Sequence, residues 1–245
     1  MSDADATYQG LVGEALFRPV RNGNAFEDTV ARLLQTIRLG IVPPGEALPP
    51  ERELALRFSV SRDTVRDAIR SLAEAGYLVA RRGRYGGTFV VDTLPGHVVE
   101  DAARHTLSTD EIDDVLGLRE ILEVGAARAA AARSLSAVDR DMLWQRLKET
   151  ASASSEDYRR FDSRLHLAIA ELVGTPSLVS LIADNRTAVN DLLGHIPLLA
   201  RNIAHSNEQH EAIVVSILTG DQDRAAEVML EHLAGSAALL RGFLT

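Results

Sequence analysis

The sequence predicts a mainly α-helical protein in two parts. The first is a winged helix-turn-helix over residues 25–92, and the second is an all-α helical bundle over residues 97–245. Three observations support this fold class. Apolar residues recur with helical spacing along most of the chain. Aromatic residues make up only 4% of it, while alanine and leucine dominate. Short β-prone runs, joined by glycines, occur once, directly after a pair of short helices.

The N-terminal segment begins without regular structure. Residues 1–24 are polar and have no clear period, which predicts a flexible tail. An amphipathic helix is expected from Phe26 to Leu39, with its apolar residues on one face. Gly40 ends this helix, and Pro43-Pro44-Gly45 forms a rigid loop after it.

Two further helices and a tight turn follow. A short helix is expected to begin near Pro50, because proline is tolerated in a first helical turn. Ser59-Val60 is read as the turn, and Ser61 as the N-cap of a helix over residues 62–75 that Gly76 stops.

A glycine-rich hairpin completes this part of the chain. Two β-prone runs, Tyr77–Arg82 and Thr88–Val91, are joined by a tip at residues 83–87. Residues 92–96 read as a linker. Two helices, a turn, a helix and a hairpin within fewer than seventy residues are typical of a winged helix-turn-helix.

Every periodic stretch after the linker is helical. The expected helices start near His97, Thr109, Ala137, Glu156, Pro176, His205 and Asp221.

Composition limits the possible functions. The net charge is −9, but residues 1–92 contain twelve arginines and twelve acidic residues, so the excess acid lies in the second part. An acidic average therefore does not exclude DNA binding by the first part. The chain has no cysteine, which excludes disulfides and thiolate metal sites. No membrane-length apolar run and no signal pattern are present, so we expect a cytoplasmic protein with no membrane partner.

The helix after Ser61 carries a candidate DNA-reading surface. Arg62, Arg66 and Arg70 lie four residues apart and form a stripe away from the apolar face. Arginines there can pair with guanine in the major groove or hold phosphates. The alternative is that they pair with nearby acidic residues on a solvated face. The predicted DNA-binding residues are Arg52, Ser61, Arg62, Thr64, Arg66, Arg84 and Gly86.

This part of the chain resembles the DNA-binding domain of the GntR family of bacterial regulators. The resemblance implies that arginines matching Arg52, Arg62 and Arg66 contact double-stranded operator DNA and that the wing tip enters the minor groove. Pro50 departs from the commoner serine, which weakens the expected cap. The matching runs are LPPERELA at 48–55, VSRDTVRDA at 60–68, GYL at 76–78 and GGTFV at 86–90.

The second part places four possible metal ligands on three helices. Asp162 and His166 are one turn apart beside an apolar stripe, and His210 and His232 each lie within an apolar stripe of another helix. Such nitrogen and oxygen ligands suit a divalent ion, zinc first, with nickel or manganese as alternatives. A histidine on an apolar face can equally be a satisfied core residue, and helical geometry alone leaves both interpretations open.

Two more polar residues share apolar faces. Arg119 lies among apolar residues of one helix, and Asn185 among those of another. They are candidates for binding an acidic effector. The alternative is structural, because a buried arginine needs a carboxylate and Glu123 lies four residues further on.

This second part resembles the helical ligand-binding domain of the FadR-type branch of the GntR family. The resemblance implies a divalent metal held by Asp162, His166, His210 and His232, and a small carboxylate effector such as lactate, gluconate or citrate. It argues against the acyl-CoA-binding kind of member. The matching motifs are LREILE at 118–123, FDxxxH at 161–166, HxxI at 210–213 before Gly220-Asp221, and MxxH at 229–232.

The function expected from the sequence is therefore a homodimeric transcription regulator, not an enzyme. Its binding to a palindromic operator would be modulated by an organic acid at the metal site. One alternative is a metallohydrolase with an accessory DNA-binding module, but no general base stands at motif spacing beside the four ligands. The other is a helical part that serves only as a dimerisation scaffold.

Overall fold

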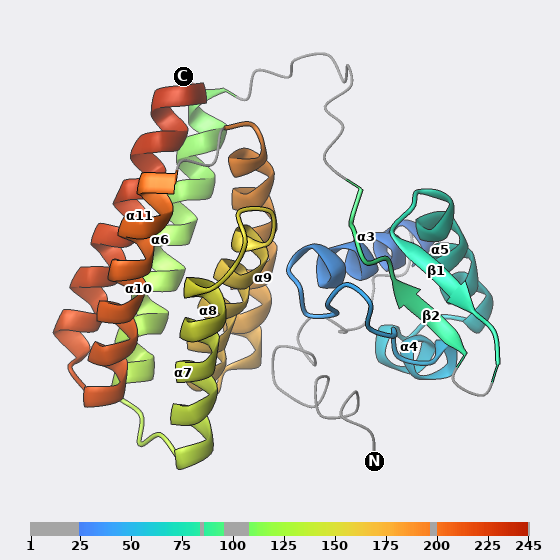
Figure 1. The fold of residues 1–245 in the computed structure, drawn as a ribbon, viewed down its shortest axis with the longest axis horizontal. Coiled ribbons are helices and arrows are strands. Elements are labelled where there is room, and N and C mark those ends of the chain that lie inside the picture. Colours follow the sequence, from blue (N-terminus) through green and yellow to red (C-terminus); the bar gives the residue numbers. More distant parts are fainter. Residues whose placement is uncertain (1–24, 84–85, 96–107, 197–199, 245) are drawn as a thin grey trace. The chain divides into compact units, whose positions relative to one another are not determined.

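The structure, a computed structural model, describes residues 25–83, 86–95, 108–196 and 200–244 (Figure 1). The expected tail at 1–24, Arg84 and the helix expected near His97 lie outside the described residues. The chain divides into two compact units, Met1–Val98 and Val99–Thr245.

The first unit is a winged helix-turn-helix, as predicted. Its helices are α3 (Ala25–Arg38), α4 (Glu51–Phe58) and α5 (Arg62–Glu74), and they are followed by strands β1 (Leu78–Arg81) and β2 (Gly87–Val90). The two strands pair antiparallel, with Leu78 opposite Val90 and Arg81 opposite Gly87.

Cap residues set the turn between α4 and α5. Ser59 ends α4 in the left-handed region, with φ 56°, which is uncommon for a residue other than glycine. Ser61 caps α5, and its Oγ accepts a hydrogen bond of 3.0 Å from the backbone N–H of Thr64. Pro50 precedes α4 as its N-cap residue and gives no side-chain cap, as expected.

The core of this unit is formed by the apolar stripes of its three helices. α5 packs against α3, α4 and β1, so the arginine-bearing face of α5 lies on the other side. The largest fully buried side chains of this core belong to Leu33, Ile37, Leu54 and Phe58.

The second unit is entirely helical in its described part. Two of its helices begin at residues other than those predicted. α8 begins at Tyr158 rather than Glu156, because residues 155–157 form a turn in which the N–H of Asp157 donates to Ser154. α10 begins at Ala200 rather than His205. The helices are α6 (Thr109–Ala131), α7 (Ala137–Ala151), α8 (Tyr158–Leu172), α9 (Pro176–Gly194), α10 (Ala200–Thr219) and α11 (Gln222–Leu244).

Capping boxes fix two of these helix starts. Ser108 and Glu111 satisfy each other's backbone N–H groups at the start of α6, and Ser136 and Asp139 do the same for α7. These reciprocal bonds explain why both starts fall where the sequence predicts them.

α6 is the central helix of the bundle (Figure 1). It packs against α8, α9, α10 and α11, and α7 packs against α8 and α10. The interior between these helices holds several charged and polar side chains as well as apolar ones. None of the helices described here has the length and apolarity that crossing a membrane requires.

Candidate metal centre

Helix α8 supplies two of the four predicted ligands. Asp162 and His166 lie one turn apart, so their side chains leave the helix on the same side. Both are buried, beside the fully buried Leu165 and the buried Ile169. The apolar face of α8 thus carries the polar pair into the interior, as the sequence predicts.

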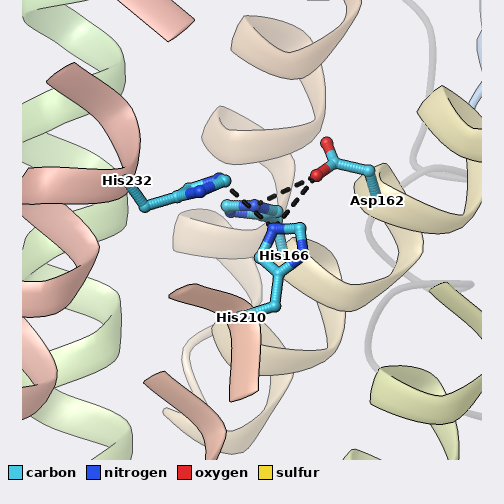
Figure 2. Close-up of side chains that lie close together, drawn as sticks. All are labelled: Asp162, His166, His210 and His232. Carbon is cyan, nitrogen blue, oxygen red and sulfur yellow. Dashed lines mark hydrogen bonds and ion pairs between the residues drawn. The ribbon is translucent and has the colours of Figure 1, made fainter. Parts of the chain in front are cut away.

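Helices α10 and α11 bring the other two ligands to the same place. His210 and His232 are both buried. The Nε2 atom of His210 lies 3.3 Å from Nε2 of His232 and 3.2 Å from Oδ1 of Asp162. The Nε2 atom of His166 lies 3.7 Å from the same Oδ1. Figure 2 shows the three rings and the carboxylate pointing toward one another.

The spacing of these donor atoms fits a shared cation. One ligand atom from each of the four residues lies within 4.8 Å of the other three. Ligand atoms about 2.0–2.1 Å from a zinc ion stand roughly 3.3 Å apart at the corners of a tetrahedron. The two closest distances, 3.2 and 3.3 Å, match that separation. Nε2 of His166 has no hydrogen-bond partner in the described part of the chain, so it is not committed to another group.

The outer atoms of the ligands contact a second set of side chains. Nδ1 of His166 pairs with Oε2 of Glu123, and Nδ1 of His232 lies 3.2 Å from Oε1 of Gln209. Oδ2 of Asp162 pairs with Nη2 of Arg186. Partners of this kind orient metal ligands in proteins.

Buried positive charges lower the pKa values of the two carboxyl groups at this centre. Burial alone would raise the pKa of Asp162, but Arg186 and the neighbouring histidines hold it well below its usual value. The pKa of Glu123 is lowered in the same way, against its burial, by His166, Arg119 and Arg186. Both carboxyl groups are therefore ionised at neutral pH.

Burial favours the neutral form of two of the imidazoles. It lowers the pKa of His166, and the attraction of Glu123 only partly opposes it. It lowers the pKa of His232 well below the usual range, and the neighbouring His210 and His166 act in the same direction. Neutral imidazole is the form that binds metal ions.

Of the two predicted effector residues, Arg119 lies beside Glu123 at this centre, and Asn185 contacts α6 at Val115. Arg119 is buried, with Nε 3.3 Å from Oε1 of Glu123 and Nη1 donating to Oγ of Ser236 at 2.7 Å. The structural alternative, a pair with Glu123, is thus present. Asn185 donates from Nδ2 to the carbonyl of Val115 at 3.0 Å, while its Oδ1 has no hydrogen-bond partner in the described chain.

The predicted DNA-binding residues that are described lie at the surface of the first unit. Arg62 and Arg52 are exposed, and the structure gives neither an ion pair among the described residues. Arg66 is half-exposed and contacts Oδ1 of Asp63 and Oε2 of Glu51, each at 3.1 Å. The alternative interpretation of the stripe therefore holds for Arg66 in this state.

Arg70 also pairs with an acidic residue of its own helix, since its Nη1 atom lies 3.7 Å from Oδ1 of Asp67. Thr64 is partly buried, and its hydroxyl is 2.8 Å from that of Ser61, which ties both residues to the cap of α5. Gly86 is exposed in the hairpin, where an added Cβ would lie only 2.6 Å from the carbonyl oxygen of Arg81.

Sequence reasoning missed one central residue, Arg186. Its side chain is fully buried on α9, between Asp162 and Glu123. A signal existed, because Arg186 lies three or four residues from Ile182 and Val189, which are buried on the same face.

A winged helix-turn-helix joined to a helical domain with a buried polar centre is the architecture of a transcription regulator. In comparisons with known proteins, residues 26–90 match the gntR family of bacterial regulatory proteins, and residues 114–235 match the FCD domain. The chain belongs to the GntR family of bacterial transcription regulators, with an FCD domain as its C-terminal part. Members of this family are regulators rather than enzymes, which confirms that expectation and removes the metallohydrolase alternative.

Individual relatives agree with this assignment. The "Putative L-lactate dehydrogenase operon regulatory protein" of Escherichia coli is 30% identical over 236 residues, covering 88% of this chain and 85% of its own length. The "HTH-type transcriptional regulator LutR" of Bacillus subtilis is 26% identical, covering 84% of this chain and 97% of its own. The solved structure of E. coli McbR/YncC, 17% identical with a TM-score of 0.54, covers 89% of this chain and 97% of that one, and supports the fold alone.

Proposed function

We propose that this regulator binds its operator under the control of a small organic acid, which binds beside a divalent metal ion held by Asp162, His166, His210 and His232. The observation that carries this proposal is the meeting of four donor atoms from three helices within 4.8 Å in a buried place. Three imidazole nitrogens and one carboxylate oxygen suit zinc, with nickel or manganese as alternatives.

Asp162 offers the ion only one of its two carboxylate oxygens. Arg186 holds Oδ2, so Asp162 offers only Oδ1 to the centre. The protein then supplies four donor atoms, and an ion that takes five or six ligands retains one or two positions. A carboxylate can fill them, since the bound ion attracts negative charge.

Unpaired polar atoms near the centre support the binding of a polar ligand. Oδ1 of Asn185, Nε of Arg186 and Oδ1 of Asn190 are buried without a hydrogen-bond partner in the described chain. Such groups are rare in protein interiors unless water or a ligand meets them. Asn185 and Arg119 remain the proposed effector residues. Arg119 also donates hydrogen bonds to Glu123 and Ser236.

For the DNA-binding part, we propose that Arg52, Ser61, Arg62, Thr64, Arg66, Arg84 and Gly86 contact the operator. The exposed face of α5 supports this, because its opposite face is packed against α3 and α4. Arg66 would exchange its contacts with Glu51 and Asp63 for contacts with DNA. A homodimer would place two such helices on the half-sites of a palindrome.

The proposal is tested with the full chain, its operator and a panel of acids. Metal content is measured first, by elemental analysis of protein that has met no chelator, and about one divalent ion per chain is expected. Operator binding is then followed by fluorescence anisotropy with L-lactate, gluconate or citrate, and lactamide serves as the uncharged control.

At least one acid should change operator affinity in metal-loaded protein and fail to do so after treatment with a chelator. An acid response of equal size in metal-free protein would contradict the metal-dependent mechanism. Protein that takes up no metal would support the alternative of a structural histidine cluster.

A further inference from the structure

Glu123 occupies an unusual place for a residue that is not itself among the ligands. It lies on the central helix α6, which contributes none of the four donor atoms, and its side chain is 3% exposed. Oε2 faces Nδ1 of His166. Oε1 lies 3.3 Å from Nε of Arg119 and 3.7 Å from Nη1 of Arg186. Each oxygen thus faces a different kind of partner, and the contact of Oε2 with Nδ1 is an ion pair outside hydrogen-bond geometry.

We infer that Glu123 is a positioning residue of the metal centre, which fixes the proton of His166 on Nδ1 and so presents the lone pair of Nε2 to the ion. This inference rests on the proposed metal-dependent function. A carboxylate with two arginines on one oxygen is an acceptor only, so the ring nitrogen that faces its other oxygen must donate. A neutral imidazole carries one proton, so Nε2 is left as the acceptor.

The position of the His166 ring agrees with this assignment. Its Nε2 atom points to the side where Oδ1 of Asp162 lies 3.7 Å away. A carboxylate oxygen and an unprotonated nitrogen do not attract each other, whereas a cation between them binds both. Glu123 therefore holds His166 in the tautomer that suits the ion and disfavours the tautomer that would hydrogen-bond to Asp162.

The other two histidines are oriented less firmly. Nδ1 of His232 meets the neutral amide of Gln209, which is only partly buried. Nδ1 of His210 has neither a hydrogen-bond partner nor an ion pair in the described chain, because the ion pair of His210 is made by Nε2. Among the three rings, His166 is the one whose outer nitrogen meets a buried, charged group, so the loss of Glu123 should weaken the centre more than the loss of Gln209.

The arginines extend this support to α9, which provides no ligand, and to α11, which provides His232. Arg186 joins Glu123 to Asp162 from α9, and Arg119 joins Glu123 to Ser236 of α11. Glu123 thereby touches one ligand directly, His166, and a second, Asp162, through Arg186. Its substitution should change metal affinity even though every ligand remains.

The test compares zinc affinity of the full-length wild type, Glu123→Gln and a matched control, Thr150→Val. Thr150 is buried on α7, where its hydroxyl bonds to the carbonyls of Arg146 and Phe161 and touches no ligand. Zinc affinity is measured by competition with a chromophoric chelator. Loss of an outer partner of a metal ligand typically lowers affinity 10–100-fold, so we expect about that increase in Kd for Glu123→Gln and none for Thr150→Val.

A second measurement needs no variant. In metal-free wild type with ¹⁵N-labelled histidine, the imidazole signals of His166 should show the proton on Nδ1. An equal zinc Kd for Glu123→Gln and wild type, or a proton on Nε2 of His166, would overturn the positioning role. Failure of wild type to bind zinc at all is a separate result, which would remove the metal centre itself.

Discussion

Replacing His210 by alanine is the most direct perturbation of the proposed centre. Its Nε2 atom is the donor that lies within 3.3 Å of two other ligands, Asp162 and His232. The ring is buried, so its removal leaves an ion with three protein donors and a space beside it. The affinity for zinc should fall so far that the variant no longer binds zinc at a free concentration that saturates the wild type.

The expected effect on stability follows from mass action. A ligand present at 100 times its Kd stabilises the folded state by about 2.7 kcal/mol. For a unit of about 150 residues, each kcal/mol raises Tm by roughly 2–4 °C. Zinc buffered at 100 times the wild-type Kd should therefore raise the Tm of the wild type by about 5–11 °C. The rise for His210→Ala should be close to zero.

Trp144 provides the assay, because it is the one tryptophan of the chain and lies on α7 of the helical unit. Its fluorescence is followed on heating, once with buffered zinc and once with a chelator. The loss of packing caused by the substitution lowers both Tm values, so the difference between them reports the effect of zinc alone. His205→Ala is the matched control, since His205 lies on the same helix with its side chain 63% exposed. A zinc-dependent rise in His210→Ala equal to that in His205→Ala would refute the ligand assignment.

Three further predictions concern DNA binding, assembly and folding. Arg66→Ala should lower operator affinity by about 1–3 kcal/mol in fluorescence anisotropy, whereas Arg128→Ala, on the helical unit, should not. Residues 93–245 alone should scatter light with twice the monomer mass, and a monomer at all concentrations would contradict dimerisation through this part. Phe58→Ala should destabilise the winged unit by about 3–5 kcal/mol. The unfolding transition of the helical unit, followed by Trp144 fluorescence, should stay at the same temperature. A decrease in its Tm equal to that of the winged unit would show that the two units unfold together.

The sequence was sufficient for the fold because local signals and packing agree. Ser61, Ser108 and Ser136 each cap a helix where the sequence predicts one. Differences arose where the local signal was weak. α10 begins five residues early, in a stretch that has no clear apolar period, and α8 begins late, because the turn that starts at Ser154 includes Glu156.

The candidate site was predictable in its ligands but not in their partners. Asp162 and His166 could be placed together because helical spacing fixes their direction, and His210 and His232 because each lies among apolar neighbours. The sequence indicated Glu123 only as a partner of Arg119. Its contact with His166 could not be predicted, because the two residues lie 43 positions apart on different helices. Arg186 was missed because Asn185 and Arg186 both lie three or four residues from Ile182 and Val189, so the apolar spacing does not decide which of the two reaches the carboxylates.

The buried arginines and carboxylates also make up a charge balance. Arg119 and Arg186 carry two positive charges, and Glu123 and Asp162 carry two negative ones, so the charges of these four buried side chains cancel. A divalent ion that enters would leave this interior with two positive charges in excess. Such an excess is costly away from water, and an acid that binds next to the ion would reduce it. By this balance, a bound ion would make the interior of the bundle selective for anions, although the four charged side chains alone have no net charge.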